Sequence, residues 1–155
     1  MNSTSTFSFA TEPKGESYSD LLVFAMNHAS TFQLVLRQDE PLGKFGRDLL
    51  HKLAPFLLND AQVSEWQGTK LLDGGFANLL TYKVDPTAIQ ALNEHSQALY
   101  EWVHPKLPED LIFLRSDQSL LLLTISHEKE ADLVLLPSEV SDFRATCPDI
   151  GLHPR

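Results

Sequence analysis

Two pairs of reactive side chains stand at the ends of one apolar stretch, Pro108 to Glu128. Glu109 and Asp110 open the stretch with adjacent carboxylates, and His127 and Glu128 close it with an imidazole beside a carboxylate. A carboxylate that accepts a hydrogen bond from an imidazole raises the pKa of the ring and orients it as a base or a ligand. These four residues are therefore the candidate binding site of this chain.

The residues between the two pairs predict a β-hairpin with its turn at 116–119. In this register Arg115 pairs with Leu120, and Asp110 and His127 lie at the same end of one face. Both faces are apolar in the middle, so we expect the hairpin in the centre of a sheet that is covered on both sides. A simpler interpretation of the polar ends is that Asp110 caps a turn, His127 ends a strand and the two Glu side chains are solvated. Because polar residues commonly finish strands, the sequence favours this interpretation.

The motifs of known catalytic and metal sites are absent from the sequence. His127 and Glu128 resemble the start of the zinc-protease helix motif, but Ala131 stands where its second His should be. There is no nucleophile elbow, Walker loop or dinucleotide glycine pattern, and Cys147 has no flanking base. We therefore assign no catalytic residue, no metal ligand and no cofactor from the sequence.

Two further patterns suggest binding sites but have simpler explanations. Residues 43–46 match the short GxxG loop of KH domains, yet they begin an amphipathic helix in an acidic chain. Trp66, Tyr82, Tyr100 and Trp102 could line the ligand pocket of a small-molecule sensor. Aromatic residues beside apolar periodicity more often belong to a core, which is the interpretation we favour.

The composition narrows the classes of partner. The 155 residues include 21 acidic and 12 basic side chains, which gives a formal net charge of −9. Phosphate backbones and anionic lipids are bound by concentrated Lys and Arg, so the charge disfavours a nucleic-acid or membrane partner and favours a basic protein. The single cysteine indicates a reducing compartment, and the sequence shows neither a signal peptide nor a long apolar run. We therefore expect a cytoplasmic protein.

Hydrophobic periodicity predicts helices that alternate with strands. Helices are expected to begin near Ser19, Asp39 and Pro86, and strands are expected at Phe32–Arg37 and at 130–136. A further hairpin is predicted around Asp73-Gly74-Gly75, whose glycines allow the positive φ angles of a tight turn. If these three residues form the loop, Trp66 faces Tyr82 across the two strands.

Together these elements predict an α+β fold. We expect one largely antiparallel sheet of about five or six strands with helices packed on it. Residues 17–145 would form this single domain. Residues 1–16 are rich in Ser and Thr and predict a disordered leader, whereas residues 146–155 predict an irregular tail.

Four short patterns in this chain resemble those of a protein family. They are W-x-G-T at Trp66–Thr69, L-Y-x-W at Leu99–Trp102, LPEDLIFLR at Leu107–Arg115 and ISHEKEADL at Ile125–Leu133. The combination resembles a family of short bacterial proteins without an established activity, some of them loosely labelled as sporulation proteins. The resemblance implies a bacterial, cytosolic protein and supplies no catalytic residue.

Two functions are compatible with these observations. The first is a non-catalytic binding protein, of an accessory or immunity type, that covers a basic protein partner; it is favoured because the chain has negative charge without recognisable chemistry. The alternative is a small metal-dependent or acid–base enzyme that uses Asp110, His127 and Glu128.

Overall fold

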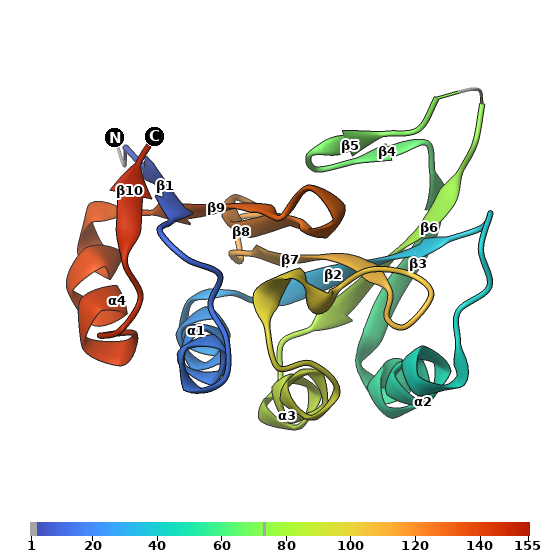
Figure 1. The fold of residues 1–155 in the computed structure, drawn as a ribbon, viewed down its shortest axis with the longest axis horizontal. Coiled ribbons are helices and arrows are strands. Elements are labelled where there is room, and N and C mark those ends of the chain that lie inside the picture. Colours follow the sequence, from blue (N-terminus) through green and yellow to red (C-terminus); the bar gives the residue numbers. More distant parts are fainter. Residues whose placement is uncertain (1–2, 73) are drawn as a thin grey trace.

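The computed structural model describes residues 3–72 and 74–155, in which eight strands form one antiparallel sheet (Figure 1). The strand order across the sheet is β10-β1-β9-β8-β7-β2-β6-β3, and a separate two-stranded hairpin, β4–β5, lies above one face. The strands are β1 (Ser5–Phe9), β2 (Thr31–Arg37), β3 (Leu57–Val63), β4 (Glu65–Trp66), β5 (Thr69–Lys70), β6 (Ala77–Lys83), β7 (Glu109–Leu114), β8 (Leu120–Ile125), β9 (Glu130–Leu135) and β10 (Leu152–Pro154).

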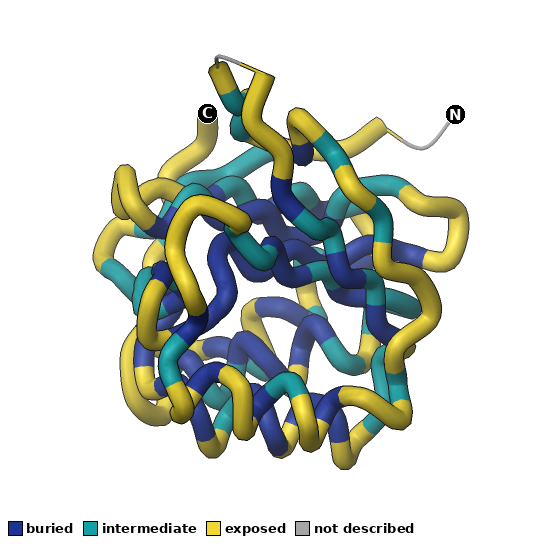
Figure 2. Tube along the Cα trace, turned by 90° about the vertical axis from the view of Figure 1, so that its right-hand side faces the viewer, coloured by how far each residue is buried: buried dark blue, intermediate teal, exposed yellow. Residues whose placement is uncertain are grey.

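Four α-helices cover the other face of the sheet (Figure 1). They are α1 (Glu16–His28), α2 (Lys44–Leu53), α3 (Pro86–His95) and α4 (Val140–Thr146), with short 3-10 helices η1 (Ala54–Phe56), η2 (Leu99–Glu101), η3 (Ser126–Glu128) and η4 (Pro137–Glu139). The predicted α+β class is therefore confirmed. Buried residues concentrate along the strands and on the inward sides of the helices (Figure 2), which places the main core between these two layers.

The β7–β8 hairpin lies in the middle of the sheet, as its composition predicts. β7 pairs with β2 and β8 pairs with β9, so neither strand is an edge. Leu111 and Phe113 face the helices, whereas Ile112 and Leu114 belong to a second apolar cluster on the opposite face. The described strand residues of β7 are all buried, because helices cover one side and the β4–β5 hairpin covers the other.

A bulge changes the predicted register at the turn end of this hairpin. Phe113 pairs with Leu122 as expected, but Leu114 pairs with Leu120, so the predicted pair of Arg115 with Leu120 does not form. The extra residue, Leu121, turns with Leu122 into the helix-side core instead of lying beside Leu123. A bulge places two residues opposite one, so the side-chain alternation is interrupted at that point.

The second predicted hairpin is paired differently in the structure. β6 pairs with β3 and β2, whereas Trp66 pairs with Thr69 inside the small β4–β5 hairpin. Trp66 therefore does not face Tyr82, whose ring stacks on Phe32 with centroids 5.1 Å apart. The predicted turn at Asp73 lies outside the described residues. The segment Leu57–Val63 was not expected to be a strand, because Asn59, Asp60 and Gln62 interrupt its apolar residues. It lies at the edge of the sheet, where a strand needs less apolar sequence than a central one does.

Strands also replace the expected disordered leader and irregular tail. Ser5–Phe9 forms β1 between β9 and β10, and Leu152–Pro154 forms β10 at the edge of the sheet. Phe7, Phe9 and Leu152 pack against the helix-side core, and this burial offsets the entropy of ordering the two ends. The two ends therefore add strands to the sheet, and β3 adds another, which gives eight strands instead of five or six.

Candidate functional site

Asp110 lies at the start of β7 and connects three separate parts of the chain. Its side chain is fully buried, and its backbone has a positive φ of 57°. One carboxylate oxygen, Oδ2, accepts a hydrogen bond from Trp66 Nε1 at 3.0 Å, and the other, Oδ1, accepts one from the Ser126 backbone N–H at 3.0 Å. Asp110 therefore holds the β4–β5 hairpin and the η3 turn against the sheet.

Glu109 lies next to Asp110 and is also buried, with 7 % of its surface exposed. Its Oε2 atom lies 3.5 Å from Nη1 of Arg37, at the end of β2. The guanidinium of Arg37 is directed mainly at Asp39, with Nε and Nη2 donating to the two carboxylate oxygens at 3.1 and 3.0 Å. Arg37 therefore neutralises Asp39 more completely than it neutralises Glu109.

Burial raises the pKa of both adjacent carboxyl groups. For Asp110 the loss of hydration dominates, and the hydrogen bonds from Trp66 and Ser126 offset part of the increase in pKa. For Glu109 the loss of hydration again dominates; the positive charge of Arg37 lowers the pKa and the negative charge of Asp110 raises it. For both groups, the nearby hydrogen bonds and positive charges thus offset only part of the effect of burial on the pKa.

The structure brings together three of the four predicted site residues. Ligand atoms of Glu109, Asp110 and His127 all lie within 4.8 Å of one another. His127 is half exposed, and its Nε2 lies 3.8 Å from Glu128 Oε1 in a contact at the surface. Glu128 is outside the three-residue group, and the enzyme that would use Asp110, His127 and Glu128 stays a prediction.

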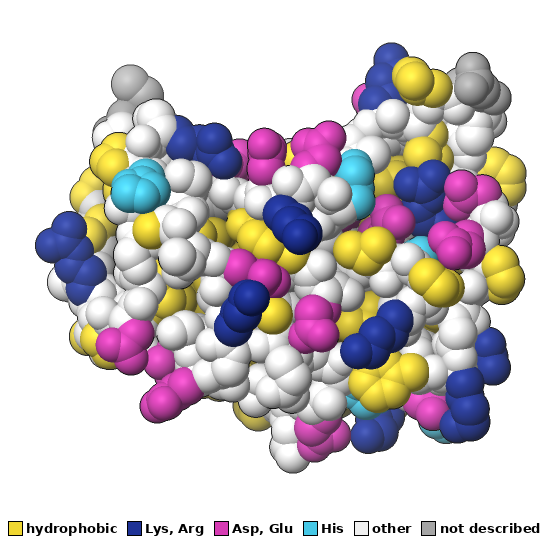
Figure 3. Space-filling view, in the orientation of Figure 1, with side chains coloured by type: hydrophobic (Ala, Val, Ile, Leu, Met, Phe, Trp, Pro, Cys, Tyr) yellow, Lys and Arg dark blue, Asp and Glu magenta, His cyan; other side chains and the backbone are white. Residues whose placement is uncertain are grey.

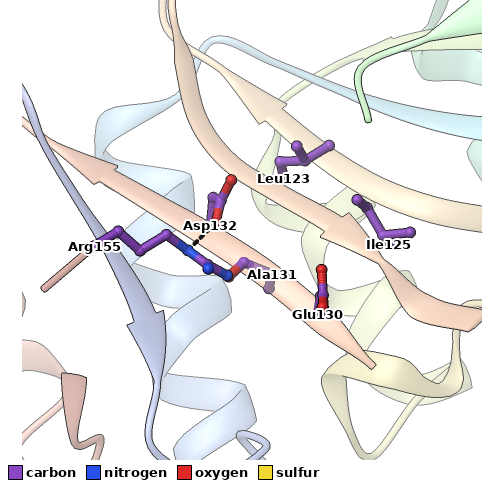
Figure 4. Close-up of a pocket in the computed structure, with 6 residues that line it drawn as sticks. All are labelled: Leu123, Ile125, Glu130, Ala131, Asp132 and Arg155. Atoms are coloured by element: carbon purple, nitrogen blue, oxygen red, sulfur yellow. Dashed lines mark hydrogen bonds and ion pairs between the residues drawn. The ribbon is translucent and has the colours of Figure 1, made fainter. Parts of the chain in front are cut away.

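A hollow lies on the face of the sheet opposite the helices. It has a volume of about 130 Å³ and opens over β8 and β9 (Figure 4). The residues that line it are Leu123, Ile125, Glu130, Ala131, Asp132 and Arg155. On β9, Glu130 and Asp132 alternate with residues of the helix-side core, so strand periodicity directs both carboxylates to the open face.

Arg155 occupies one side of the hollow. Its Nε lies 2.5 Å from Asp132 Oδ1, and its Nη2 donates to the carbonyl oxygen of Ala131 at 3.3 Å (Figure 4). The Arg155 backbone N–H donates to Thr6 O at 2.9 Å, which fixes this end of the chain beside β1. The hollow therefore already accommodates a guanidinium group between a carboxylate and a backbone carbonyl.

The turn of the β4–β5 hairpin packs against Ile125, one of the residues that line the hollow. Gly68 has a φ of +85°, and a Cβ at this position would lie 2.9 Å from Ile125 Cδ1. Only glycine combines this backbone conformation with so close an approach. Figure 3 shows the resulting surface: it is hollowed between the hairpin and the chain ends, and Asp and Glu side chains gather along the floor.

The sequence pattern placed Trp66 only in a possible aromatic pocket and not beside Asp110, and it gave Asp132 and Arg155 no part in a site. Asp132 and Arg155 are far apart in the chain and form no motif, so only the pairing of β1 with β9 and β10 brings them together. The alternation of acidic and apolar residues in Glu130–Leu135 was the one available signal, because it marks a strand with a charged face.

Comparisons with protein-family models, with curated proteins and with solved structures gave no match for this chain. The family resemblance stays a prediction. Among the residues that the structure describes, none of the helices is both long and apolar enough to span a bilayer.

Proposed function

We propose that this protein is a non-catalytic binding protein that holds a basic segment of a partner protein in the hollow between β4–β5 and the chain ends. The main observation behind the proposal is the position of Arg155, whose guanidinium contacts the Asp132 carboxylate and the Ala131 carbonyl oxygen. A site that accepts a guanidinium from its own chain has the charge and the acceptor geometry to accept one from a partner.

The chemistry of the hollow supports a basic and partly apolar ligand. Leu123 and Ile125 supply an apolar floor, along which the methylene stem of a Lys or Arg can lie. Glu130 is exposed and forms no ion pair within the described part of the chain, so it offers a second acceptor beside Asp132. The net charge of −9 would attract a basic partner over a longer range and speed its encounter.

The proposal places the protein in a reducing compartment, the bacterial cytoplasm. Cys147 is buried, and burial raises the pKa of its thiol to about 12, so it stays a protonated core residue there. Fractionation of the native host tests this location, and recovery of the protein in a secreted fraction contradicts it.

Binding of a designed peptide tests the proposed function. We would titrate the full chain with a peptide of alternating Gly and Arg and measure affinity by calorimetry at low and physiological salt. The proposal predicts one binding site whose affinity weakens as salt screens the charges, whereas the matched Gly–Glu peptide does not bind.

Charge-reversal variants locate the binding site. Glu130→Lys and Asp132→Lys are expected to weaken peptide binding at least tenfold, because each replaces an attraction with a repulsion. Asp149→Lys makes the same charge change at an exposed position outside the hollow and is the matched control. Arg155→Ala removes the competing guanidinium and is expected to strengthen binding several-fold. Equal losses in Asp132→Lys and Asp149→Lys, or weaker binding by Arg155→Ala, would refute the assignment.

A further inference from the structure

One buried oxygen in the three-residue group lacks a hydrogen-bond donor. The Glu109 side chain is about nine-tenths buried, and its Oε2 atom is inaccessible to solvent. Even so, Oε2 accepts no hydrogen bond from any described residue. Its contact with Arg37 Nη1, at 3.5 Å, is longer than a good hydrogen bond. Since buried polar atoms are nearly always paired, this oxygen can accept a closer donor or positive group than Arg37 provides.

The charges around Glu109 leave the same need. Arg37 supplies one positive charge, which it shares between Asp39 and Glu109, and Asp110 adds a further buried carboxylate. His127 adds a half-exposed imidazole on the side where the group meets solvent. With all carboxylates ionised, this cluster has two negative charges in excess, which one divalent cation would neutralise.

We propose that Glu109, Asp110 and His127 bind one first-row divalent metal ion, with Zn²⁺ as the representative ion. Two carboxylates and one imidazole form the mixed oxygen and nitrogen donor set that such ions accept. The site is independent of the peptide-binding function proposed above, because none of its three ligands lines the hollow.

The geometry requires only a small closure around the ion. Donor atoms about 2.1 Å from a common ion lie at most about 4.2 Å apart, and the three donors here lie within 4.8 Å of one another. His127 is 45 % exposed and belongs to a short turn, so its ring can move toward the buried carboxylates.

Existing hydrogen bonds already orient one of the ligands. Trp66 Nε1 and the Ser126 N–H each occupy one lone-pair direction of the Asp110 carboxylate, and each oxygen keeps a second lone pair for a metal. Hydrogen bonds of this kind fix ligand orientation in metal sites. A bound ion would therefore connect β7 with η3 and, through Asp110, with the β4–β5 hairpin.

Calorimetry with ZnCl₂ alone on the chelator-treated full chain tests the site. The expected result is one ion per chain with micromolar or tighter affinity and a raised melting temperature. Ca²⁺ at the same concentration is expected not to bind, because it prefers a larger set of oxygen ligands. Glu109→Gln, which is nearly isosteric, and His127→Ala, at an exposed position, are each expected to weaken Zn²⁺ binding at least tenfold.

Matched variants distinguish this site from adventitious zinc binding. Glu128→Gln alters the exposed neighbour of His127, and His153→Ala removes another exposed imidazole; both should keep the wild-type affinity within about twofold. Trp66→Phe removes a hydrogen bond to a ligand and is expected to weaken binding by about tenfold or more. The proposal is overturned if Zn²⁺ does not bind, or if Glu109→Gln and His127→Ala bind it as tightly as Glu128→Gln does.

Discussion

The contact between Trp66 and Asp110 predicts a stability effect that depends on pH. Trp66→Phe keeps an aromatic ring but removes the Nε1–H donor that lies 3.0 Å from Asp110 Oδ2. A hydrogen bond to an ionised group contributes about 1.5–3 kcal/mol, whereas one between neutral groups contributes about 0.5–1.5 kcal/mol. We therefore expect the hydrogen-bond part of the Trp66→Phe penalty to fall by about 1 kcal/mol when Asp110 becomes protonated.

The direction of this change follows from the pKa of Asp110. Burial raises this pKa above the ordinary value of 3.8, and the Trp66 hydrogen bond offsets part of the increase. Removing the donor raises the pKa further, so ionised Asp110 costs the folded variant more stability than it costs the wild type. The penalty is therefore largest at neutral pH and shrinks as the pH falls toward 3.8.

Trp102→Phe provides a matched control. Trp102 is fully buried, and its Nε1–H donates to the neutral hydroxyl of Tyr18 at 3.1 Å. Burial raises the pKa of Tyr18 to about 12, so its protonation does not change in acid. The free energy of unfolding of both variants would be measured in urea by far-ultraviolet circular dichroism from pH 8 down to 3.8, where a carboxyl group with a raised pKa is mostly protonated. A Trp66→Phe penalty that is constant across this range, like that of Trp102→Phe, would refute the assigned role of the hydrogen bond.

Three further perturbations test other parts of the structure. Arg115→Met removes the closest ion-pair partner of buried Glu139 and leaves only the 3.8 Å contact with His28 among the ion pairs of the described residues. We expect the free energy of unfolding in urea to fall by about 3–5 kcal/mol, whereas a loss below about 1 kcal/mol would contradict a buried pair. Burial acts to raise the pKa of Glu139, but hydrogen bonds from Arg115 and the Leu136 N–H outweigh it and lower the pKa below 4.5. This carboxylate therefore stabilises the fold above pH 4.5, and the contribution is lost as the pH falls through the lowered pKa. In Glu139→Gln, the free energy of unfolding should depend less on pH in this acidic range. The same pH dependence as in the wild type would contradict the prediction. Gly68→Ala places a Cβ at a positive φ and against the Ile125 side chain. We expect the free energy of unfolding to fall by about 1–3 kcal/mol and amide hydrogen exchange in the β4–β5 hairpin to become faster. Unchanged exchange in the hairpin would show that the hairpin does not pack against Ile125.

The centre of the fold was predictable because the central strands are apolar on both faces. A strand that is buried on both faces has few alternatives to a central position, and β7 and β8 take that position. The bulge at Leu121 was not predictable, because the apolar run Leu120–Leu123 fits either register equally well. The edge strand Leu57–Val63 was missed for the opposite reason, since Asn59, Asp60 and Gln62 interrupt its apolar residues.

The site was predictable in its residue types but not in its contacts. The β7–β8 hairpin brings Glu109 and Asp110 near His127, as predicted, although His127 lies in the η3 turn and not at the end of a paired strand. The partners of these residues come from distant segments: Arg37 ends β2, and Trp66 lies in a hairpin whose place above the sheet follows from tertiary packing. Local patterns contain no information on such contacts, because the hydrogen bonds of Asp110 depend on how distant segments pack together.

The most direct test of the proposed binding function follows the side chain of Arg155 itself. In a ¹⁵N-labelled sample, the Nε–Hε resonance of Arg155 reports the contact with Asp132, in which the two atoms lie 2.5 Å apart. Titration with the Gly–Arg peptide is expected to shift this resonance toward that of a solvated arginine, together with the backbone signals of Ile125 and Glu130. Saturating peptide that leaves the Arg155 resonance in place, while signals on the helical face move, would contradict the account.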